Sequence, residues 1–192
     1  RMRTLIKKEL MAAAETYGDD RMSPIVSRGE AIAFKEEQLI AAEPITVILS
    51  EKGWIRAAKG LEFDHSGLAY RSGDSFLTKV SGRSNQNVIL MDSTGRSYSL
   101  AAHSLPSARS HGEPVSGRLN PVPGATFCDM VMGSHDEALL LSTTAGYGFI
   151  GRLGELETKN KAGKASLSVP KGGAIIAAQR VPHKDTDLIA AV

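Results

Sequence analysis

Residues 47–53 (VILSEKG), 90–95 (LMDSTG) and 139–146 (LLLSTTAG) share one order: an apolar run, a polar turn and a closing glycine. A run that contains aromatic residues follows each copy. The closing glycines lie at positions 53, 95 and 146, so successive copies are 42 and 51 residues apart. Repeats of about this length are typical of propellers and other repeat folds. The pattern therefore predicts an all-β, propeller-like domain of about three blades.

Each copy is predicted to form a β-hairpin. The apolar run is the first strand, the glycine suits a left-handed turn residue, and the following run alternates as a half-buried strand does. The hairpins are expected near residues 45–60, 87–102 and 138–153, and residues 188–192 look like the start of a fourth copy beginning near residue 187. Three unrelated hairpins in another all-β domain are the alternative, and the shared order of features disfavours it.

A short amphipathic helix is predicted before the repeats. Its apolar residues recur at spacings of three and four, and Gly18 is placed to end it. We expect a helical tail and linker over residues 1–28 and the β domain over residues 29–192. Residues 30–34 (EAIAF) fit an edge or exchanged strand, but residues 35–38 (KEEQ) fit a helical turn equally well. The apolar residues of the helix are Met2, Ile6, Leu10, Ala13 and Tyr17.

Composition limits the class of protein. The 192 residues suffice for one all-β domain with a small appendage, and the net charge of +2 does not indicate a polybasic nucleic-acid binder. The single cysteine, Cys128, excludes an internal disulfide framework and suits a buried thiol in a reducing cytoplasm. The sequence has no apolar run of about 18 residues and no signal-peptide pattern, and this argues against membrane insertion and export. Because the chain starts at Arg1 and ends in an apolar run at Val192, we expect a piece of a longer polypeptide.

Patterns of catalytic or metal-binding residues are missing from the sequence. The five histidines form no HxxxH-type pair, and no cysteine cluster accompanies them. The glycine-rich residues 146–151 lie inside a predicted strand, where glycines let strands pack closely. Tyr98 and Tyr147 occupy strand positions expected of core or near-core residues. The chain itself is therefore expected to be non-catalytic, with no metal site and no cofactor of its own.

Basic residues gather in the predicted loops. Residues 71–118 contain six basic and three acidic residues, and a second basic group surrounds residues 159–164. Such loops suit phosphate contacts made by side chains and backbone N–H groups. For any single arginine, an ordinary solvated position is the better explanation. Recurrence in successive repeats favours a track of phosphate contacts that binds DNA by charge and bending rather than by base sequence.

Six segments together resemble one known family: residues 54–60 (WIRAAKG), 92–100 (DSTGRSYSL), 105–109 (LPSAR), 112–114 (GEP), 145–149 (AGYGF) and 160–164 (NKAGK). They closely resemble the C-terminal domain of the A subunit of bacterial topoisomerase IV. The helix and residues 18–21 (GDDR) resemble the family's exit from its coiled-coil arm. The resemblance covers nearly the whole chain.

The resemblance implies a β-pinwheel whose basic rim binds and bends double-stranded DNA. In the family this domain engages the transported duplex while the parent, an ATP-dependent type IIA topoisomerase, decatenates and relaxes DNA in chromosome segregation. The cleavage tyrosine lies upstream, and ATP and Mg are used on other domains. The implied partners are DNA, the ATPase-bearing B subunit and the remainder of the A subunit, all cytoplasmic.

Only basic loop positions carry over from the family as DNA contacts. The alternatives are a propeller that binds a protein partner and a DNA-wrapping domain of the gyrase A type. The sequence lacks gyrase's QRRGGKG-type box, which argues against strong wrapping, and the family's disc has more blades than three and a fragment. The expected DNA contacts are Arg56, Lys59, Arg83, Arg96, Arg109, Lys159, Lys161 and Lys164.

Overall fold

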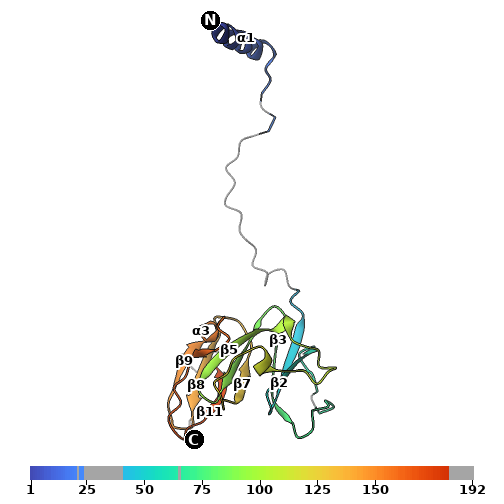
Figure 1. Cartoon of the computed structure of the whole chain (residues 1–192), viewed down its shortest axis with the longest axis vertical. Coiled ribbons are helices and arrows are strands. Elements are labelled where there is room, and N and C mark those ends of the chain that lie inside the picture. Colours follow the sequence, from blue (N-terminus) through green and yellow to red (C-terminus); the bar gives the residue numbers. More distant parts are fainter. Residues whose placement is uncertain (21, 24–40, 65, 182–192) are drawn as a thin grey trace. The chain divides into compact units, whose positions relative to one another are not determined.

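The computed structural model describes residues 1–20, 22–23, 41–64 and 66–181. The chain divides into two compact units, Arg1–Ala33 and Phe34–Val192, and we call the second the β unit (Figure 1). Three predictions lie outside the described residues: the boundary between residues 28 and 29, the strand or helical turn at residues 30–38, and the fourth copy at residues 188–192.

The first unit contains helix α1, Met2–Tyr17, where the apolar spacing predicts a helix. No residue of α1 is buried. Gly18 ends the helix with a φ of −72°, in an extended conformation rather than the left-handed one that such glycines often adopt. A Cβ atom at Gly18 would overlap the carbonyl oxygen of Ala14, and this close approach accounts for the glycine. None of the described helices is long and apolar enough to cross a membrane.

The β unit consists of three antiparallel sheets, which confirms the predicted all-β repeat fold. Sheet A has the strand order β3-β1-β2-β6, sheet B the order β10-β5-β4-β7 and sheet C the order β11-β8-β9. The strands of sheet A are β1 Pro44–Ser50, β2 Trp54–Lys59, β3 Phe76–Arg83 and β6 Glu113–Pro114. Those of sheet B are β4 Asn87–Asp92, β5 Arg96–Ala101, β7 Phe127–Val131 and β10 Lys164–Ala165. Those of sheet C are β8 Ala138–Thr143, β9 Gly148–Arg152 and β11 Ile175–Arg180.

The hairpins β1–β2, β4–β5 and β8–β9 lie at the three sequence repeats. Their closing glycines have positive φ angles of 75° at Gly53, 87° at Gly95 and 81° at Gly146, as the turn pattern predicts. At Gly95 the turn also lies so close to the backbone of Leu167 that a Cβ atom would overlap its carbonyl oxygen. The repeated apolar-turn-glycine order is therefore the signature of one hairpin used three times.

Two segments cross from one sheet back to the preceding one. Strand β6 follows the hairpin of sheet B in the chain but pairs with β2 of sheet A. Strand β10 follows the hairpin of sheet C but pairs with β5 of sheet B. We call residues 105–115 crossing segment 1 and residues 157–166 crossing segment 2. Each crossing segment ties one repeat to its neighbour.

The segments that follow the second and third hairpins also match each other at a spacing of 51 residues. The 3-10 helix Ala102–Ser104 precedes crossing segment 1, and the short helix α3, Leu153–Leu156, precedes crossing segment 2. Leu105 and Leu156 are both buried at the ends of these helices, 51 residues apart. Gly112 and Gly163, again 51 residues apart, both have positive φ. The crossing segments are thus equivalent parts of one repeat.

The core has two apolar clusters that share sheet B. Alternate residues of β4 face opposite ways: Val88 and Leu90 lie in the first cluster, with side chains of sheet A, and Ile89 and Met91 lie in the second, with side chains of sheet C. Strand β4 is therefore buried on both faces. Tyr98 of β5, fully buried in the first cluster, lies in the core as predicted.

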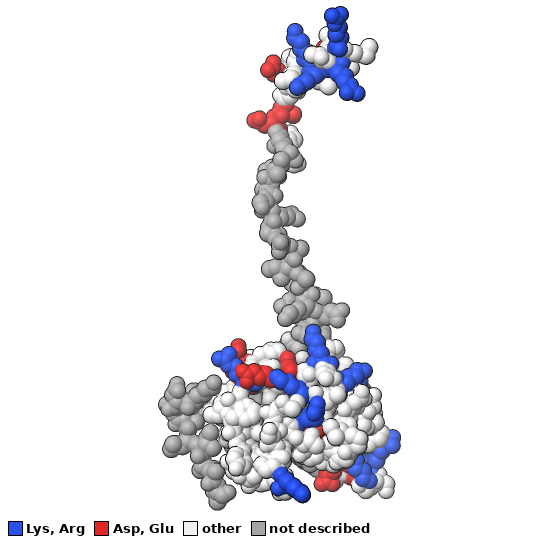
Figure 2. All heavy atoms as spheres, turned by 60° about the vertical axis from the view of Figure 1, so that its left-hand side comes forward, with Lys and Arg blue, Asp and Glu red and all other residues white. Residues whose placement is uncertain are grey.

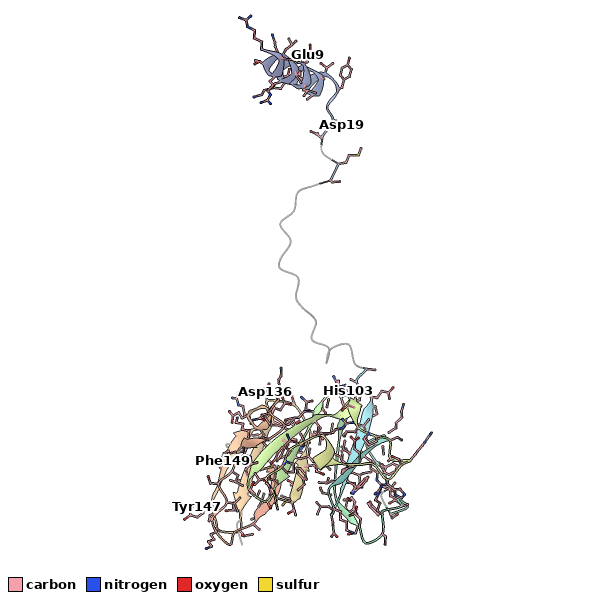
Figure 3. The ribbon with its side chains drawn as sticks, viewed as in Figure 1. Glu9, Asp19, His103, Asp136, Tyr147 and Phe149 are labelled. Atoms are coloured by element: carbon pink, nitrogen blue, oxygen red, sulfur yellow. The ribbon has the colours of Figure 1, made fainter. Side chains whose placement is uncertain are left out.

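Sheet C differs from its neighbours at its outer edge. Among the described residues, no strand pairs with the side of β9 that faces away from β8. The equivalent strands of the other sheets are paired on that side, β2 with β6 and β5 with β10. Tyr147 is consequently 67 % exposed, so the prediction that it lies in or near the core is wrong. Phe149, which matches the buried Tyr98 in the repeat, is 43 % exposed. Figure 3 shows both side chains at the outer edge of the β unit.

Candidate nucleic-acid interface

Basic and acidic side chains are nearly balanced on the β unit, so single contacts decide which cations are available. On the face shown in Figure 2, charged side chains of both signs lie around a broad uncharged area. Several cations are tied to neighbouring carboxylates or carbonyl groups. The crossing segments, in contrast, also carry cations that have no such partner among the described residues.

Crossing segment 1 folds around Arg56. It first runs beside Ala57, whose N–H donates to the Pro106 carbonyl at 2.8 Å and whose carbonyl accepts from Ala108 N–H at 2.8 Å. It then turns at residues 107–112 and returns antiparallel to β2, with Trp54 opposite Pro114. The turn thereby closes over the middle of β2.

Arg56 is buried beneath this turn, with only 4 % of its surface exposed. Its Nη1 donates to the carbonyls of Ala69 and Ser110, both at 3.0 Å. Its guanidinium also lies 4.6 Å from the ring centre of Tyr70. Arg56 therefore joins crossing segment 1 to the loop after β2, and in this conformation it offers nothing to a phosphate.

Crossing segment 2 folds over β5 in the same way. Lys164 pairs with Ser97, and the N–H groups of Ser166 and Leu167 both donate to the Gly95 carbonyl. The turn at residues 160–163 is closed by Gly163 N–H, which donates to the Asn160 carbonyl at 2.9 Å.

Arg96 lies under this second turn and is half-buried. Its Nε donates to the Ala162 carbonyl at 3.1 Å and its Nη2 to the Gly163 carbonyl at 3.3 Å. A third carbonyl of the turn, that of Lys161, accepts from Asn120 N–H at 2.8 Å. Three successive carbonyl groups of the turn therefore accept hydrogen bonds from other parts of the β unit.

Tyr98 supports the turn from below. Its ring lies against Gly163, where a Cβ atom would come within 2.6 Å of the ring. Its hydroxyl donates to Asp92 Oδ2 at 2.7 Å. Burial and this hydrogen bond to Asp92 raise the pKa of Tyr98 to about 12, so the hydroxyl stays protonated and keeps donating at physiological pH.

Three of the expected DNA contacts are exposed and unpaired. Arg109 lies in the turn of crossing segment 1, and Lys159 and Lys161 lie at the turn of crossing segment 2. Within the described part of the chain, their side chains make neither ion pairs nor hydrogen bonds. These cations can turn toward an external anion without breaking an internal contact.

Three further expected contacts are exposed but have internal partners. Lys59 Nζ lies 3.1 Å from Glu43 Oε2. Arg83 Nη1 makes a long contact of 3.5 Å with the Ala42 carbonyl, and Lys164 Nζ donates to the Glu155 carbonyl at 2.7 Å. Exposed pairs of this kind are weak and readily exchanged for a stronger anion. The eight residues thus divide into free cations, tied cations and the two arginines bound to crossing-turn carbonyls, the buried Arg56 and the half-buried Arg96.

In the described part of the β unit, one cation outside the expected set has the same character as the free ones. Lys171, in the turn before β11, is exposed and has no partner among the described residues. Its position before two glycines, Gly172 and Gly173, is the turn signal that could have identified it. Arg71 is exposed too, but its guanidinium stacks 3.8 Å from the ring centre of Trp54.

Cys128 and possible metal ligands give no further site. Cys128 is half-buried rather than buried, with Sγ 3.4 Å from the Thr126 carbonyl, and burial raises the pKa of its thiol. Within the described ranges, no three metal-ligating side chains come together.

Comparisons with known proteins identify close relatives. The chain is 53 % identical over 192 residues to the A subunit of DNA topoisomerase 4 from Pseudomonas aeruginosa, a match that covers 100 % of this chain and 26 % of that protein. It is 48 % identical over 176 residues to the corresponding protein of Escherichia coli K12, a match that covers 92 % of this chain and 23 % of that protein. The chain therefore spans about a quarter of the length of these relatives. No protein-family model matches it.

Solved structures agree with this similarity. The Escherichia coli ParC C-terminal domain superposes with a TM-score of 0.70 at 45 % identity, covering 74 % of this chain and 58 % of that one. The DNA gyrase A C-terminal domain superposes with a TM-score of 0.52 at 19 % identity, covering 72 % and 48 %, and shows likeness of fold alone. The overall fold described above is thus similar to solved domains of both kinds.

Proposed function

The chain belongs with the C-terminal domains of topoisomerase IV A subunits, and from this premise we propose that its β unit binds and bends double-stranded DNA without cutting it. It engages the transported duplex, and the longer cytoplasmic enzyme decatenates and relaxes DNA. Its partners are DNA, the B subunit and the rest of the A subunit. ATP and Mg act on the other domains.

The free cations on the crossing segments are the main support for this proposal. Arg109 lies on one segment, and Lys159 and Lys161 lie on the other. The two segments are equivalent parts of the repeat, and at the 51-residue spacing Arg109 matches position 160, which lies between the two lysines. A repeated row of cations without a base-reading element favours contact with phosphates.

The proposed contacts differ in strength. Arg109, Lys159 and Lys161 bind phosphates directly, since they give up no internal partner. Lys59, Arg83 and Lys164 add weaker contacts after exchanging theirs. Arg56 and Arg96 belong to the support of the crossing segments.

Fluorescence anisotropy with a labelled duplex over a salt series tests the proposal. Each phosphate contact contributes about 0.9 to the slope of log affinity against log salt. We expect steep salt dependence, and a loss of about tenfold or more in affinity for the double variant R109E/K161E, because each substitution turns attraction into repulsion.

A charge-matched control is available on α1. Lys7 and Lys8 are exposed and lie outside the β unit, so K7E/K8E, which changes the net charge as much as R109E/K161E does, should leave DNA affinity nearly unchanged. Absence of binding at low salt, or equal affinity of R109E/K161E and wild type, would overturn the proposal and favour the protein-binding alternative.

A further inference from the structure

Two strands of the β unit place an arginine beneath a crossing turn. Arg56 of β2 donates to the Ser110 carbonyl, and Arg96 of β5 donates to the carbonyls of Ala162 and Gly163. Ser110 and Lys161 are equivalent, 51 residues apart, so both arginines bind the backbone at or next to the same point of the repeat. The arginines themselves are not at equivalent strand positions: Arg56 is three residues after its closing glycine and Arg96 one residue after. Arginines at two different strand positions therefore bind the backbone of the two crossing turns, at nearby rather than identical carbonyls.

We infer that Arg96 is a positioning residue for DNA binding, which holds the 160–163 turn so that Lys159 and Lys161 face the duplex, and that it does not itself contact DNA. The inference rests on the proposed function. It reassigns an arginine that the sequence predicts to be a phosphate contact.

The carbonyl groups of the 160–163 turn already have hydrogen-bond donors. The carbonyls of Lys161, Ala162 and Gly163 all accept hydrogen bonds from within the protein, one from Asn120 and two from Arg96. A carbonyl oxygen is the negative end of the peptide dipole, so an outward carbonyl would repel a phosphate beside Lys161. By binding two of the three, Arg96 offsets their negative ends and leaves the exposed side chains of Lys159 and Lys161 as the free charges of the turn.

The geometry of the guanidinium explains why arginine serves here. Nε and Nη2 donate together to two neighbouring carbonyls from one planar group. A lysine keeps the charge but has no planar fork, so it cannot hold two carbonyls in this arrangement. R96K thus removes the paired hydrogen bonds while it keeps the positive charge.

A double-mutant cycle on the full chain tests the inference through DNA affinity. We expect R96K to weaken duplex binding about threefold to tenfold although the net charge is kept. In the K159Q/K161Q background, R96K should change affinity less than about twofold, because the cations that it positions are gone. A direct phosphate contact predicts the reverse: R96K close to wild type, and R96Q lowering the salt slope by about 0.9 in both backgrounds. That result would overturn the inference.

Hydrogen exchange without DNA gives an independent reading. The Asn120 amide donates to the Lys161 carbonyl and the Gly163 amide closes the turn, so both amides should exchange faster in R96K. The Ala102 amide, which donates to the Gln86 carbonyl elsewhere beside sheet B, is the control and should exchange at an unchanged rate. Unchanged exchange at Asn120 and Gly163 would overturn the inference even if the wild-type protein binds DNA. If the wild-type protein binds no DNA, the proposed function fails, while faster exchange would still show that Arg96 holds the turn.

A matched arginine gives the control for the substitution itself. Arg180 of β11 also donates to a backbone carbonyl, that of Met132, and pairs with Glu137 at 3.2 Å, but it lies outside both crossing segments. R180K should leave duplex affinity within about twofold of wild type. An equal loss in R180K and R96K would mean that any loosening of the fold weakens binding, and would also overturn the inference.

Discussion

Asp129 of β7 is a buried carboxylate that binds a neighbouring strand. It is 7 % exposed, and its Oδ2 accepts from Ala178 N–H of β11 at 2.7 Å. Burial raises the pKa of its carboxyl, and the hydrogen bonds from the backbone of Ala178 and Met130 oppose that rise. The protonated form of Asp129 is therefore more favoured in the folded state than in the unfolded chain.

The pH dependence of stability follows from this shift. Because the folded-state pKa is raised, Asp129 lowers stability above that pKa, and this penalty disappears as the pH falls toward the unfolded value of 3.8. Asn at this position keeps an acceptor for Ala178 N–H without the charge. D129N should therefore be at least as stable as wild type at about pH 7, and this advantage should shrink at about pH 4. Thermal unfolding of both proteins at the two pH values measures it, and an advantage that grows on acidification would contradict it.

Single residues also show how far the sequence predicts the site. The left-handed glycines at 53, 95 and 146 follow from local turn chemistry, and they are confirmed. Burial of Arg56 does not follow from its own neighbourhood, since charged residues are rarely buried. One signal was available: Arg56 lies three residues after its closing glycine, as the core residue Tyr98 does. Tyr147 shows the reverse case, because its exposure depends on a strand pairing that no local pattern encodes.

At the scale of elements, the hairpins were predictable and the crossing segments were not. A hairpin is formed by residues close in sequence, so its period and turn are visible in the chain. Strands β6 and β10 are each two residues long and pair with a hairpin that precedes them by about one repeat. The sequence therefore predicts them only as long polar loops. The positive φ angles of Gly112 and Gly163 are the local trace of the crossing.

Gly163 tests how tightly crossing segment 2 is held. G163A adds a Cβ atom at a positive φ of 73° and within 2.6 Å of the Tyr98 ring. We expect it to lower the free energy of unfolding by about 1–3 kcal/mol and to weaken DNA binding, because the turn that carries Lys161 must move. Chemical denaturation and anisotropy measure the two effects.

Gly172 is the matched control for this substitution. Its φ is 82°, but no atom lies within 4 Å of the Cβ position. G172A therefore shares the backbone strain without the overlap, and should be less destabilising than G163A. Equal losses of stability would show that the Tyr98 contact does not constrain crossing segment 2.

At the scale of the whole molecule, β9 presents an edge that can pair with another chain. In the described ranges the outer side of β9 is unpaired. Phe149 and Ile150 of this strand are 43 % and 40 % exposed, and Tyr147, just before it, is 67 % exposed. Exposed apolar edge strands favour association between chains, and a charged residue on the edge opposes it. We expect wild-type protein to associate with rising concentration and F149K to associate less. Sedimentation velocity at fixed salt measures this.

Val122 provides the comparison for F149K. It is exposed to the same extent, 43 %, but lies in a loop, so V122K should associate as wild type does. Wild-type protein that stays monomeric at all concentrations would contradict the prediction. Association that F149K does not reduce would point to the exposed apolar side of α1 instead.

Strand β4 has consequences for how the β unit comes apart. Because its alternate residues complete two separate apolar clusters, sheet B cannot open without exposing both. In a row of repeats, cooperativity passes only between neighbours. Among the described residues, sheets A and C share no cluster of their own, so each senses the loss of the other through sheet B, that is through β4 and through β7, whose Met130 and Val131 also lie in the first and the second cluster. Cavities made on both faces of sheet B would uncouple the two ends into separate unfolding transitions, whereas a cavity in either end sheet would leave a two-sheet remnant folded.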